Sequence, residues 1–368
     1  TKKKKPARAG EAEKVAIKMA SSKQLGVMVV GAGDVSKNYF GHCQRDERTR
    51  IVAVADPNHE ALRRAEQTYR PDVVAEDYKE LLGREDIGVV VVLTPHHLHY
   101  PVVMDALKAG KDVICEKPIT VSVGQADEMI DFARKCGRKF LVTLNSQFTP
   151  RSFKIREILS RKLLGEVFMA HVAYLGYEYA RMADPNHWKG DSAKAGGGVL
   201  LDGGYHIVDL ANSFLGRARY VQAAGGRYVV EAPQKGEDNI TLLVEYAGGA
   251  VADLQVSFTA CNVGCDRAPT LMIDIDLYGA DGSLRYGYGW DAVEIREEME
   301  LLRPQKGRET IDLSQGDYPD CYSHFFDCLI QDAKPIVTPM HARNALAVVE
   351  AAYESMRSGR KIEVNWRS

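Results

Sequence analysis

The feature that most limits what this chain can fold into is a series of short, uninterrupted apolar segments between residues 26 and 144. Charged stretches with helical spacing, such as Gln125–Cys136, separate most of these segments, which are Val27–Val30, Ile51–Ala55, Val89–Leu93, Val113–Cys115 and Phe140–Leu144. A continuous apolar strand is buried on both faces, which is typical of a parallel sheet covered by helices. The pattern predicts a doubly wound α/β domain.

The hydrophobic pattern changes after about residue 165. Ile240–Tyr246 and Ala252–Phe258 partly alternate between apolar and polar residues, and Ala247-Gly248-Gly249 separates them like a hairpin turn. Leu271–Tyr278 leads into a second turn signal at Ala280–Ser283. We therefore predict an α+β domain with a large, mostly antiparallel open sheet. The predicted boundaries are an N-terminal arm at 1–23, a first domain at 24–145 and a second at 146–368.

Size and charge narrow the possible functions. A chain of 368 residues can form two cores. Its net charge of −2 gives no general attraction to nucleic acid or to an anionic membrane, so neither is expected as a partner. The apolar runs are too short to span a bilayer. The basic segment Thr1–Pro6 opens an arm without a secretory apolar region, and we expect this arm to pack on a neighbouring subunit.

The cysteines indicate a reducing compartment. There are seven of them, an odd number, and no two have C-x-x-C spacing. This pattern favours reduced thiols and a cytoplasmic location. Cys261 and Cys265 could form half of a metal site, but no further Cys or His pair follows at zinc spacing, so we expect no metal.

The first apolar strand leads into a glycine-rich turn that is typical of a dinucleotide site. The turn comprises Gly31, Ala32, Gly33, Asp34 and Val35, and it precedes a predicted helix at Ser36. Gly31 permits the tight turn, and Gly33 lets a pyrophosphate approach the main chain at the helix N-terminus. The third glycine of the usual G-x-G-x-x-G pattern is replaced by Ser36.

Asp56 strengthens the case for a dinucleotide and favours NAD over NADP. It ends the second apolar strand, 25 positions after Gly31, near the spacing expected for the acid that binds a ribose. A carboxylate there accepts hydrogen bonds from the ribose hydroxyls and repels a 2′-phosphate. The alternative is that Asp56-Pro57-Asn58 only caps the following helix.

Three histidines follow the third main apolar strand, in the segment Thr94-Pro95-His96-His97-Leu98-His99. Because the carboxyl ends of parallel strands face the ligand crevice, we expect Thr94, Pro95 and His99 to line the cofactor site. A metal site is the alternative, but these histidines are not spaced i, i+4 on one helix.

A second set of polar residues follows the glycine run Gly196-Gly197-Gly198. If residues 200–214 are helical, Asp202 and His206 lie on one face, with Asp209 nearly on the same face. Gly203 and Gly204 disfavour a helix by up to about 1 kcal/mol each, which indicates that something approaches the backbone closely. The alternative is that His206 is a buried histidine hydrogen-bonded to Asp202 or Asp209.

Lys117 stands at the end of the strand Val113–Cys115, after Glu116 and before Pro118, where a cis peptide bond is possible. Oxidation of a secondary alcohol needs a base for the hydroxyl proton, and histidine suits this task. A nearby lysine stabilises the developing alkoxide. We therefore assign catalysis to Lys117 and His206, with Glu116 and Lys117 also beside the nicotinamide. The alternative is a solvated lysine paired with Glu116.

These motifs together resemble the glucose–fructose oxidoreductase, inositol dehydrogenase and rhizopine-catabolism (Gfo/Idh/MocA) family. The matching segments are Gly31-Ala32-Gly33, Ala55-Asp56, Thr94-Pro95 with His99, Ala109-Gly110-Lys111 followed by Glu116-Lys117-Pro118, and Gly196-Gly197-Gly198 followed by Asp202-x-Gly204-x-His206-x-x-Asp209. The resemblance implies an N-terminal Rossmann domain, a second domain whose open sheet forms dimers or tetramers, and sugar or cyclitol substrates.

The resemblance also implies site residues. Lys117, Asp202 and His206 match the catalytic trio, with Asp202 holding a substrate hydroxyl and His206 acting as acid and base. Family members often carry an arginine near the position of Gln147, so the neutral amide here favours a neutral substrate. Trp188 and the tyrosines Tyr174, Tyr177 and Tyr179 could stack on a sugar or belong to the core.

Three functions remain open from the sequence. The first is an NAD-dependent dehydrogenase that acts on a secondary hydroxyl of a neutral sugar, glycoside or cyclitol. The second keeps NAD(H) tightly bound and uses transient sugar oxidation to drive another step, such as sugar–sugar oxidoreduction or glycosidic cleavage. The third is a non-catalytic dinucleotide sensor, which would have no use for a proton acceptor.

Overall fold

A computed structural model describes residues 24–184, 187–230, 236–260, 270–290 and 295–368 of the chain. The arm expected at 1–23 and the pair Cys261 and Cys265 lie outside these ranges. The chain divides into two compact units between Val91 and Val92. The domain boundary expected at 145/146 remains a prediction.

The first sheet has six strands in the order β3-β2-β1-β4-β5-β6. The pairs β1/β2, β2/β3 and β5/β6 are parallel. The elements in chain order are β1 (Leu25–Val30), α2 (Ser36–Arg45), β2 (Thr49–Ala55), α3 (His59–Tyr69), β3 (Val73–Ala75), β4 (Val89–Val92), α4 (His99–Lys108), β5 (Asp112–Glu116), α5 (Val123–Cys136) and β6 (Phe140–Thr143). These strands are covered on both faces, as expected, because residues such as Val27, Val54, Val90 and Ile114 are fully buried. The predicted doubly wound Rossmann sheet is confirmed.

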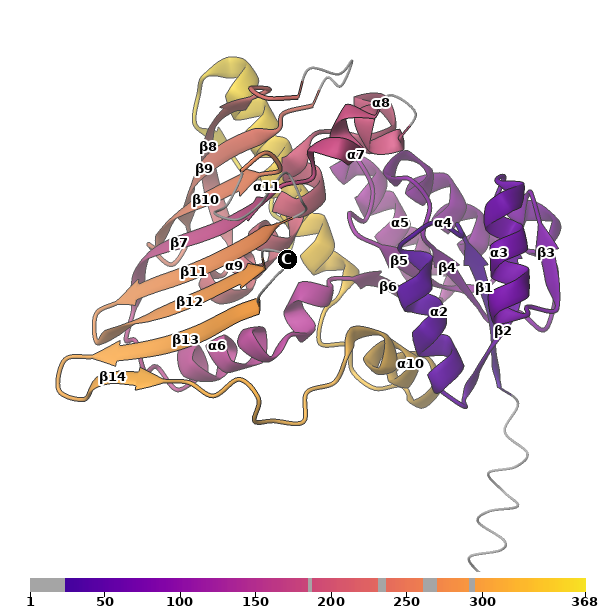
Figure 1. The fold of residues 1–368 in the computed structure, drawn as a ribbon, viewed down its shortest axis with the longest axis horizontal. Coiled ribbons are helices and arrows are strands. Elements are labelled where there is room, and N and C mark those ends of the chain that lie inside the picture. Colours follow the sequence, from indigo (N-terminus) through magenta and orange to yellow (C-terminus); the bar gives the residue numbers. More distant parts are fainter. Residues whose placement is uncertain (1–23, 185–186, 231–235, 261–269, 291–294) are drawn as a thin grey trace, which may run out of the picture. The chain divides into compact units, whose positions relative to one another are not determined.

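The second sheet has nine strands in the order β14-β13-β12-β11-β7-β10-β9-β8-β15 (Figure 1). Its strands are β7 (Val167–Gly176), β8 (Ala218–Gly226), β9 (Asn239–Tyr246), β10 (Val251–Ser257), β11 (Leu271–Gly279), β12 (Gly282–Trp290), β13 (Ile295–Arg303), β14 (Gly307–Thr310) and β15 (Ile362–Glu363). Among the paired strands, β7 and β10 run parallel and the others antiparallel. The mostly antiparallel sheet and both predicted hairpin turns are therefore confirmed.

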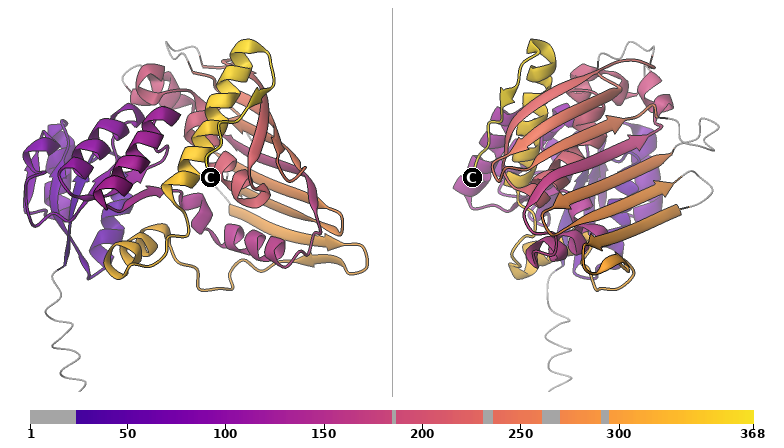
Figure 2. Two further views of the ribbon diagram at one scale, coloured as in Figure 1. Left: turned by 180° about the vertical axis from the view of Figure 1, so that it is seen from behind. Right: turned by 90° about the vertical axis from the view of Figure 1, so that its left-hand side faces the viewer.

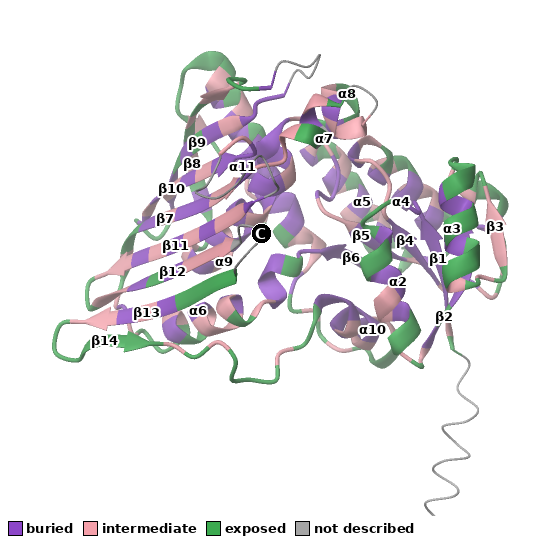
Figure 3. Ribbon diagram, in the orientation of Figure 1, coloured by how far each residue is buried: buried purple, intermediate pink, exposed green. Residues whose placement is uncertain are grey.

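Helices cover one face of this sheet. The helices of this part of the chain are α6 (Pro150–Ser160), α7 (Tyr179–Ala183), α8 (Ser192–Ala195), α9 (Tyr205–Leu215), α10 (Cys321–Gln331) and α11 (Pro339–Ser358). Helix α11 packs against β8, and helix α9 packs against β7 and β10 (Figures 1 and 2). Alternate residues of β9 and β10, such as Leu242, Val244 and Leu254, are fully buried beneath them (Figure 3). The opposite face carries no helix from the described ranges (Figure 2, right).

The predicted helix at 200–214 forms, but it is not a uniform α-helix. Residues Leu200–Gly204 make a π-helical turn, and α9 begins at Tyr205. An added Cβ at Gly203 would lie 2.6 Å from the Phe258 ring, and one at Gly204 would lie 2.9 Å from Val256. The group that approaches these two glycines is therefore the sheet itself. This close contact brings Asp202 and His206 down onto β7 and β10.

The C-terminal helix ends as its sequence predicts. Helix α11 stops at Ser358, and Gly359 follows with a φ of 69°, the left-handed conformation that favours glycine. Arg343 of this helix is buried, and its Nη2 lies 3.0 Å from Oδ2 of Asp127 on α5. No helix in the described ranges is both long enough and apolar enough to cross a membrane.

We predict that Gly203→Ala lowers the free energy of unfolding by about 1–3 kcal/mol, because the buried Phe258 ring must move to admit the methyl group. This clash exceeds the gain in helix propensity of about 1 kcal/mol. Urea-induced unfolding measures the change. Gly248→Ala is the control, since open space surrounds that position, and equal stability of the two variants would contradict the prediction.

Candidate active site

The glycine turn after β1 has the geometry of a dinucleotide-binding loop. Gly31 has a φ of 100°, which a side chain would disfavour. An added Cβ at Gly33 would meet nothing within 4 Å, so the main chain there is open to a ligand. Asp34 and Val35 follow on the exposed side, with Val35 50% exposed, and α2 begins at Ser36. The loop fits a pyrophosphate at the N-terminus of α2.

Asp56 is held in place by the main chain at the end of β2. Its Oδ2 accepts a hydrogen bond from the amide of Ala32 at 2.7 Å, and its Oδ1 accepts one from the amide of Asn58 at 2.8 Å. Each oxygen keeps a lone pair that can accept from a ribose hydroxyl. The segment Asp56-Pro57-Asn58 does cap α3, through Asn58, whose side chain accepts from the amides of Glu60 and Ala61. Asp56 itself is bonded to the glycine turn instead.

The three histidines after β4 lie within hydrogen-bond distance of main-chain carbonyl groups. In His96, Nδ1 lies 2.8 Å from the carbonyl of Ala195, and in His97 it lies 3.0 Å from that of Lys194. His99 is fully buried, with Nδ1 2.7 Å from the Pro118 carbonyl and Nε2 2.9 Å from the Thr94 carbonyl. Among the residues that the structure describes, no group of three histidine, cysteine or acidic side chains could hold a metal ion.

His99 lies between the Thr94 carbonyl and the Lys117-Pro118 turn, whose peptide bond is cis as the sequence suggested. A neutral imidazole has one N–H, so the ring donates to one of the two carbonyls and only packs against the other. Burial lowers the pKa of His99 to about 4. Any part that His99 has in a cofactor site is therefore indirect. The Thr94 hydroxyl is buried and has no hydrogen-bond partner, so it can accept one from a ligand.

Lys117 forms an ion pair with Asp202. Its Nζ donates to Oδ1 of Asp202 at 2.9 Å and to the Asp202 carbonyl at 3.1 Å. The alternative of a solvated lysine paired with Glu116 is wrong. Glu116 instead accepts a hydrogen bond from the hydroxyl of Thr143 at 2.6 Å, and burial raises its pKa. Glu116 therefore anchors the end of β5 to β6.

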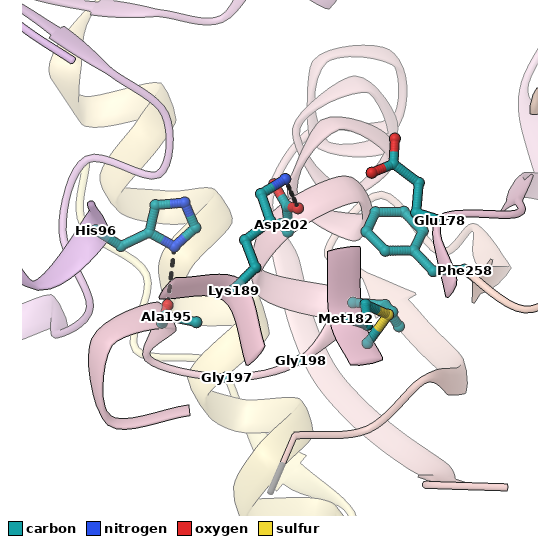
Figure 4. A pocket seen from close by; sticks show the side chains of 10 residues that line it. His96, Glu178, Met182, Lys189, Ala195, Gly197, Gly198, Asp202 and Phe258 are labelled. Atoms are coloured by element: carbon teal, nitrogen blue, oxygen red, sulfur yellow. Dashed lines mark hydrogen bonds and ion pairs between the residues drawn. The ribbon is translucent and has the colours of Figure 1, made fainter. Parts of the chain in front are cut away.

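Lys189 joins this pair, and the sequence did not reveal it. Its Nζ lies 2.5 Å from Oδ2 of Asp202 (Figure 4). With Lys117 on Oδ1, the carboxylate has an ammonium group on each oxygen. Burial raises the pKa of Asp202, but the two lysines outweigh it and hold that pKa well below its usual range. Lys189 follows the predicted residue Trp188, yet no spacing marked it as a site residue.

His206 is a neutral imidazole that opens onto a cavity. Its Nδ1 lies 2.7 Å from Oγ of Ser146, and its ring stacks on Tyr174 with centroids 6.5 Å apart. Burial and the nearby charge of Lys117 lower its pKa to about 3. The alternative that Asp202 or Asp209 satisfies His206 is wrong, because the described structure gives His206 neither of those hydrogen bonds.

Gln147 does not face that cavity. The side chain is buried, with Nε2 donating to Oδ2 of Asp209 at 2.7 Å and Oε1 accepting from Nη1 of Arg156 at 2.6 Å. Burial raises the pKa of Asp209 to about 7. The carboxamide thus ties α6 to α9. The expectation that Gln147 binds substrate finds no support in its contacts.

The cavity beside His206 has a volume of about 310 Å³. Its lining comprises Asn145, Ser146, Thr149, Arg151, Tyr174, His206, Ile207, Leu210 and Ile273. Arg151 and Ser146 were not predicted from the sequence. A smaller cavity of about 20 Å³ lies at His96, Lys189 and Asp202 (Figure 4).

The four aromatic residues considered in the sequence, Tyr174, Tyr177, Tyr179 and Trp188, lie in different surroundings. Tyr174 lines the larger cavity, and the rings of Tyr177 and Tyr179 stack on each other. Trp188 packs edge-on against His96 with ring centroids 4.6 Å apart, beside Lys189. Of the four, Tyr174 is the one whose contacts place it at a cavity with His206.

The glycine turn after β1 and, separately, the ion pair of Lys117 and Asp202 near His206 are each typical of nicotinamide-dependent oxidoreductases. Residues 25–144 match the family model described as an oxidoreductase family, NAD-binding Rossmann fold, and residues 156–364 match its C-terminal alpha/beta domain. The chain belongs to the Gfo/Idh/MocA oxidoreductase family, and it is an NAD-binding oxidoreductase.

Several characterised proteins resemble this chain along most of its length. D-apiose dehydrogenase of Paraburkholderia graminis is 25% identical over 91% of this chain and 88% of its own. D-glucoside 3-dehydrogenase of Escherichia coli is 28% identical over 65% of this chain and 71% of its own. A solved structure of levoglucosan dehydrogenase with NADH has a TM-score of 0.82 and 20% identity, and it covers 94% of this chain and 100% of that one.

We predict that His206 stays neutral between pH 8 and pH 5, because burial disfavours the imidazolium. NMR titration of histidine-labelled protein measures this, with the His206 signal assigned by its loss in His206→Asn. Lys117→Met should raise the pKa by removing a repelling cation, whereas Asp202→Asn should lower it further by removing the favourable carboxylate. A titration midpoint near 6.5 in the unmodified protein would contradict the prediction.

Proposed function

We propose that this protein transfers a hydride between NAD and a secondary hydroxyl or ketone of a sugar or cyclitol. The observation that carries the proposal is the convergence of a neutral, cavity-facing His206 with the ion-paired Lys117 and Asp202. The names of the relatives, which include dehydrogenases of D-apiose and of D-glucosides, support a sugar as the substrate.

His206 is suited to take the hydroxyl proton during oxidation. In the tautomer that serves this role, Nδ1–H donates to Ser146, and Nε2 offers its lone pair to the substrate hydroxyl. Within the described residues, Nε2 has no other partner. Ser146 fixes the ring orientation, and the stacked Tyr174 limits its rotation. When bound, NAD supplies the hydride acceptor that the side chains lack.

Lys117 and Asp202 prepare the site for charge that develops on the substrate oxygen. Asp202 holds the lysine ammonium at a fixed point, from which it can stabilise an alkoxide. Lys189 shares the charge of Asp202, so the carboxylate does not cancel Lys117 completely. The open main chain at Gly33, the carboxylate of Asp56 and the unpartnered Thr94 hydroxyl are the groups that would hold the cofactor.

The finer alternatives from the sequence have separate tests. Mass spectrometry of the purified protein for retained NAD(H), together with turnover of free NAD on a sugar panel, separates a dehydrogenase from an enzyme that keeps its cofactor bound. The expectation of a neutral substrate rested on Gln147, whose carboxamide is engaged inside the protein. The charge of the substrate therefore has to be argued from the residues that line the cavity.

We also propose that the helix-free face of the nine-stranded sheet mediates self-association into a dimer or tetramer. Leu243 is 47% exposed and Met169 is 47% exposed on strands β9 and β7, and apolar surface of this kind favours burial against a second copy. Light scattering at micromolar concentration measures the mass, and a monomer would contradict the proposal. The cytoplasmic location expected from the thiols stays a prediction.

We predict that Lys117→Met and His206→Asn each lower turnover by about 10²–10⁴-fold, as removal of a general acid or base typically does. Affinity for NAD should change by no more than a few-fold, because neither residue is expected to hold the pyrophosphate or ribose. Lys194→Met is the control, since that lysine is exposed and pairs with Asp191. Near-normal turnover in His206→Asn would exclude the histidine as the base.

We predict that the unmodified protein uses NAD much better than NADP, and that Asp56→Ser narrows the difference by removing repulsion of the 2′-phosphate. The ratio of kcat/KM for the two cofactors is the measurement. Asp72→Asn, at an exposed ion pair with Arg50, serves as the control. Equal use of both cofactors by the unmodified protein would be inconsistent with this role of Asp56.

A further inference from the structure

Arg151 is the one charged side chain among the residues that line the cavity beside His206. The lining contains no aspartate or glutamate, and burial keeps His206 neutral. The other lining groups are amides, hydroxyls, a phenol and aliphatic side chains. The lining itself therefore offers a ligand one positive charge and no negative one, apart from the Lys117–Asp202 ion pair near His206.

Among the described residues, the guanidinium of Arg151 has no carboxylate partner, unlike that of Arg343. Its Nη1 donates to the Tyr286 hydroxyl at 3.3 Å, and the group lies over the Tyr286 ring, 5.4 Å from the centroid. Its Nε is buried and has no hydrogen-bond partner, and no described carboxylate forms an ion pair with it. Arg343, by contrast, is buried against Asp127. A buried donor without a partner is uncommon in proteins, so the guanidinium retains hydrogen-bonding capacity that the described side chains do not use.

The place of Arg151 in the fold strengthens this conclusion. It lies in the first turn of α6, where the helix dipole disfavours a cation and favours an anion. That turn contains no acidic residue to offset the arginine. An anionic ligand between the helix N-terminus and the guanidinium would be stabilised by both. The positive charge of Arg151 is thus unfavourable at this helix N-terminus, and a bound anion would offset it.

We propose that Arg151 is a specificity residue that binds a carboxylate on the substrate, so that the substrate is a sugar acid. This inference rests on the proposed function, because it places the carboxylate on the molecule that His206 oxidises. A single guanidinium in the lining suits a singly charged carboxylate, which it can bind through two parallel hydrogen bonds. A cavity of about 310 Å³ is at the small end of ligand sites, which favours a single sugar ring.

Matched pairs of ligands test the proposal by calorimetry on the full-length protein saturated with NADH. The pairs are the methyl pyranosides of glucose, galactose and mannose with the corresponding methyl uronosides. We expect at least one acid to bind about 10–10²-fold more tightly than its neutral partner, as a charged hydrogen bond allows. In Arg151→Gln the two affinities should fall within about threefold of each other, with the neutral sugar unaffected.

Two further variants sharpen the test. Arg151→Lys keeps the charge but loses the forked geometry, so it should retain part of the preference. Arg161→Gln, on an exposed residue at the end of α6, should keep the full preference. Retained preference in Arg151→Gln overturns the proposal, as does equal binding of every pair or binding of no acid. Glucose 6-phosphate that binds through Arg151 while every acid fails would overturn the assignment to a carboxylate.

The outcome is separable from that of the proposed function. Binding is measured without turnover, so acids that bind through Arg151 but are not oxidised would leave this inference standing and contradict the proposed chemistry. If instead Arg151→Gln and the unmodified protein oxidise neutral sugars at the same rate, and no acid binds more tightly than its neutral partner, the proposed chemistry stands and this inference is contradicted.

Discussion

The site depends on one interaction, the buried carboxylate of Asp202 between the ammonium groups of Lys117 and Lys189. A carboxylate taken out of water is strongly destabilised unless positive charge and hydrogen bonds replace its hydration. Here three segments supply the charges: the end of β5, the turn at Trp188–Gly190 and the π-helical turn before α9. Loss of either lysine leaves a partly uncompensated charge, so these segments are held together by the same contact that forms the site.

The electrostatics of this group also set the state of His206. Burial and the positive charge of Lys117 both oppose a second cation, and Asp202 only partly offsets them. The imidazole therefore stays neutral near pH 7 and can accept a proton. Ser146 contributes orientation, because its hydroxyl fixes which ring nitrogen faces the cavity. Charge and orientation thus come from different parts of the chain.

The contrast between Gln147 and Arg151 shows how position decides the role of a polar residue. Both belong to the segment that leads into α6, and the family resemblance directed attention to Gln147. Its amide is hydrogen-bonded to Asp209 and Arg156, whereas Arg151, four residues later, lines the cavity. The neutral substrate was expected from the buried Gln147, whereas Arg151 is the charged residue that lines the cavity.

Local patterns in the sequence determined much of the fold. The continuous apolar runs of β1, β2, β4, β5 and β6 predict a parallel sheet because each strand must be buried on both faces, and the alternating strands after residue 165 predict the second sheet. Gly31, Gly33 and Asp56 could be proposed because a dinucleotide requires a fixed turn and a carboxylate at a fixed spacing. Lys117, Asp202 and His206 could be proposed because their motifs are local.

Only the tertiary structure decided which of these residues touch. Asp202 is 85 residues from Lys117, and Ser146 is 60 residues from His206, so no periodicity relates either pair. Lys189 carries no motif at all, and its role follows from the turn that brings its ammonium to Asp202. Whether Arg151 has a carboxylate beside it depends on the packing of α6 against β12. A one-dimensional pattern records which side of an element is buried, but the partners of a buried charge are set by packing between elements.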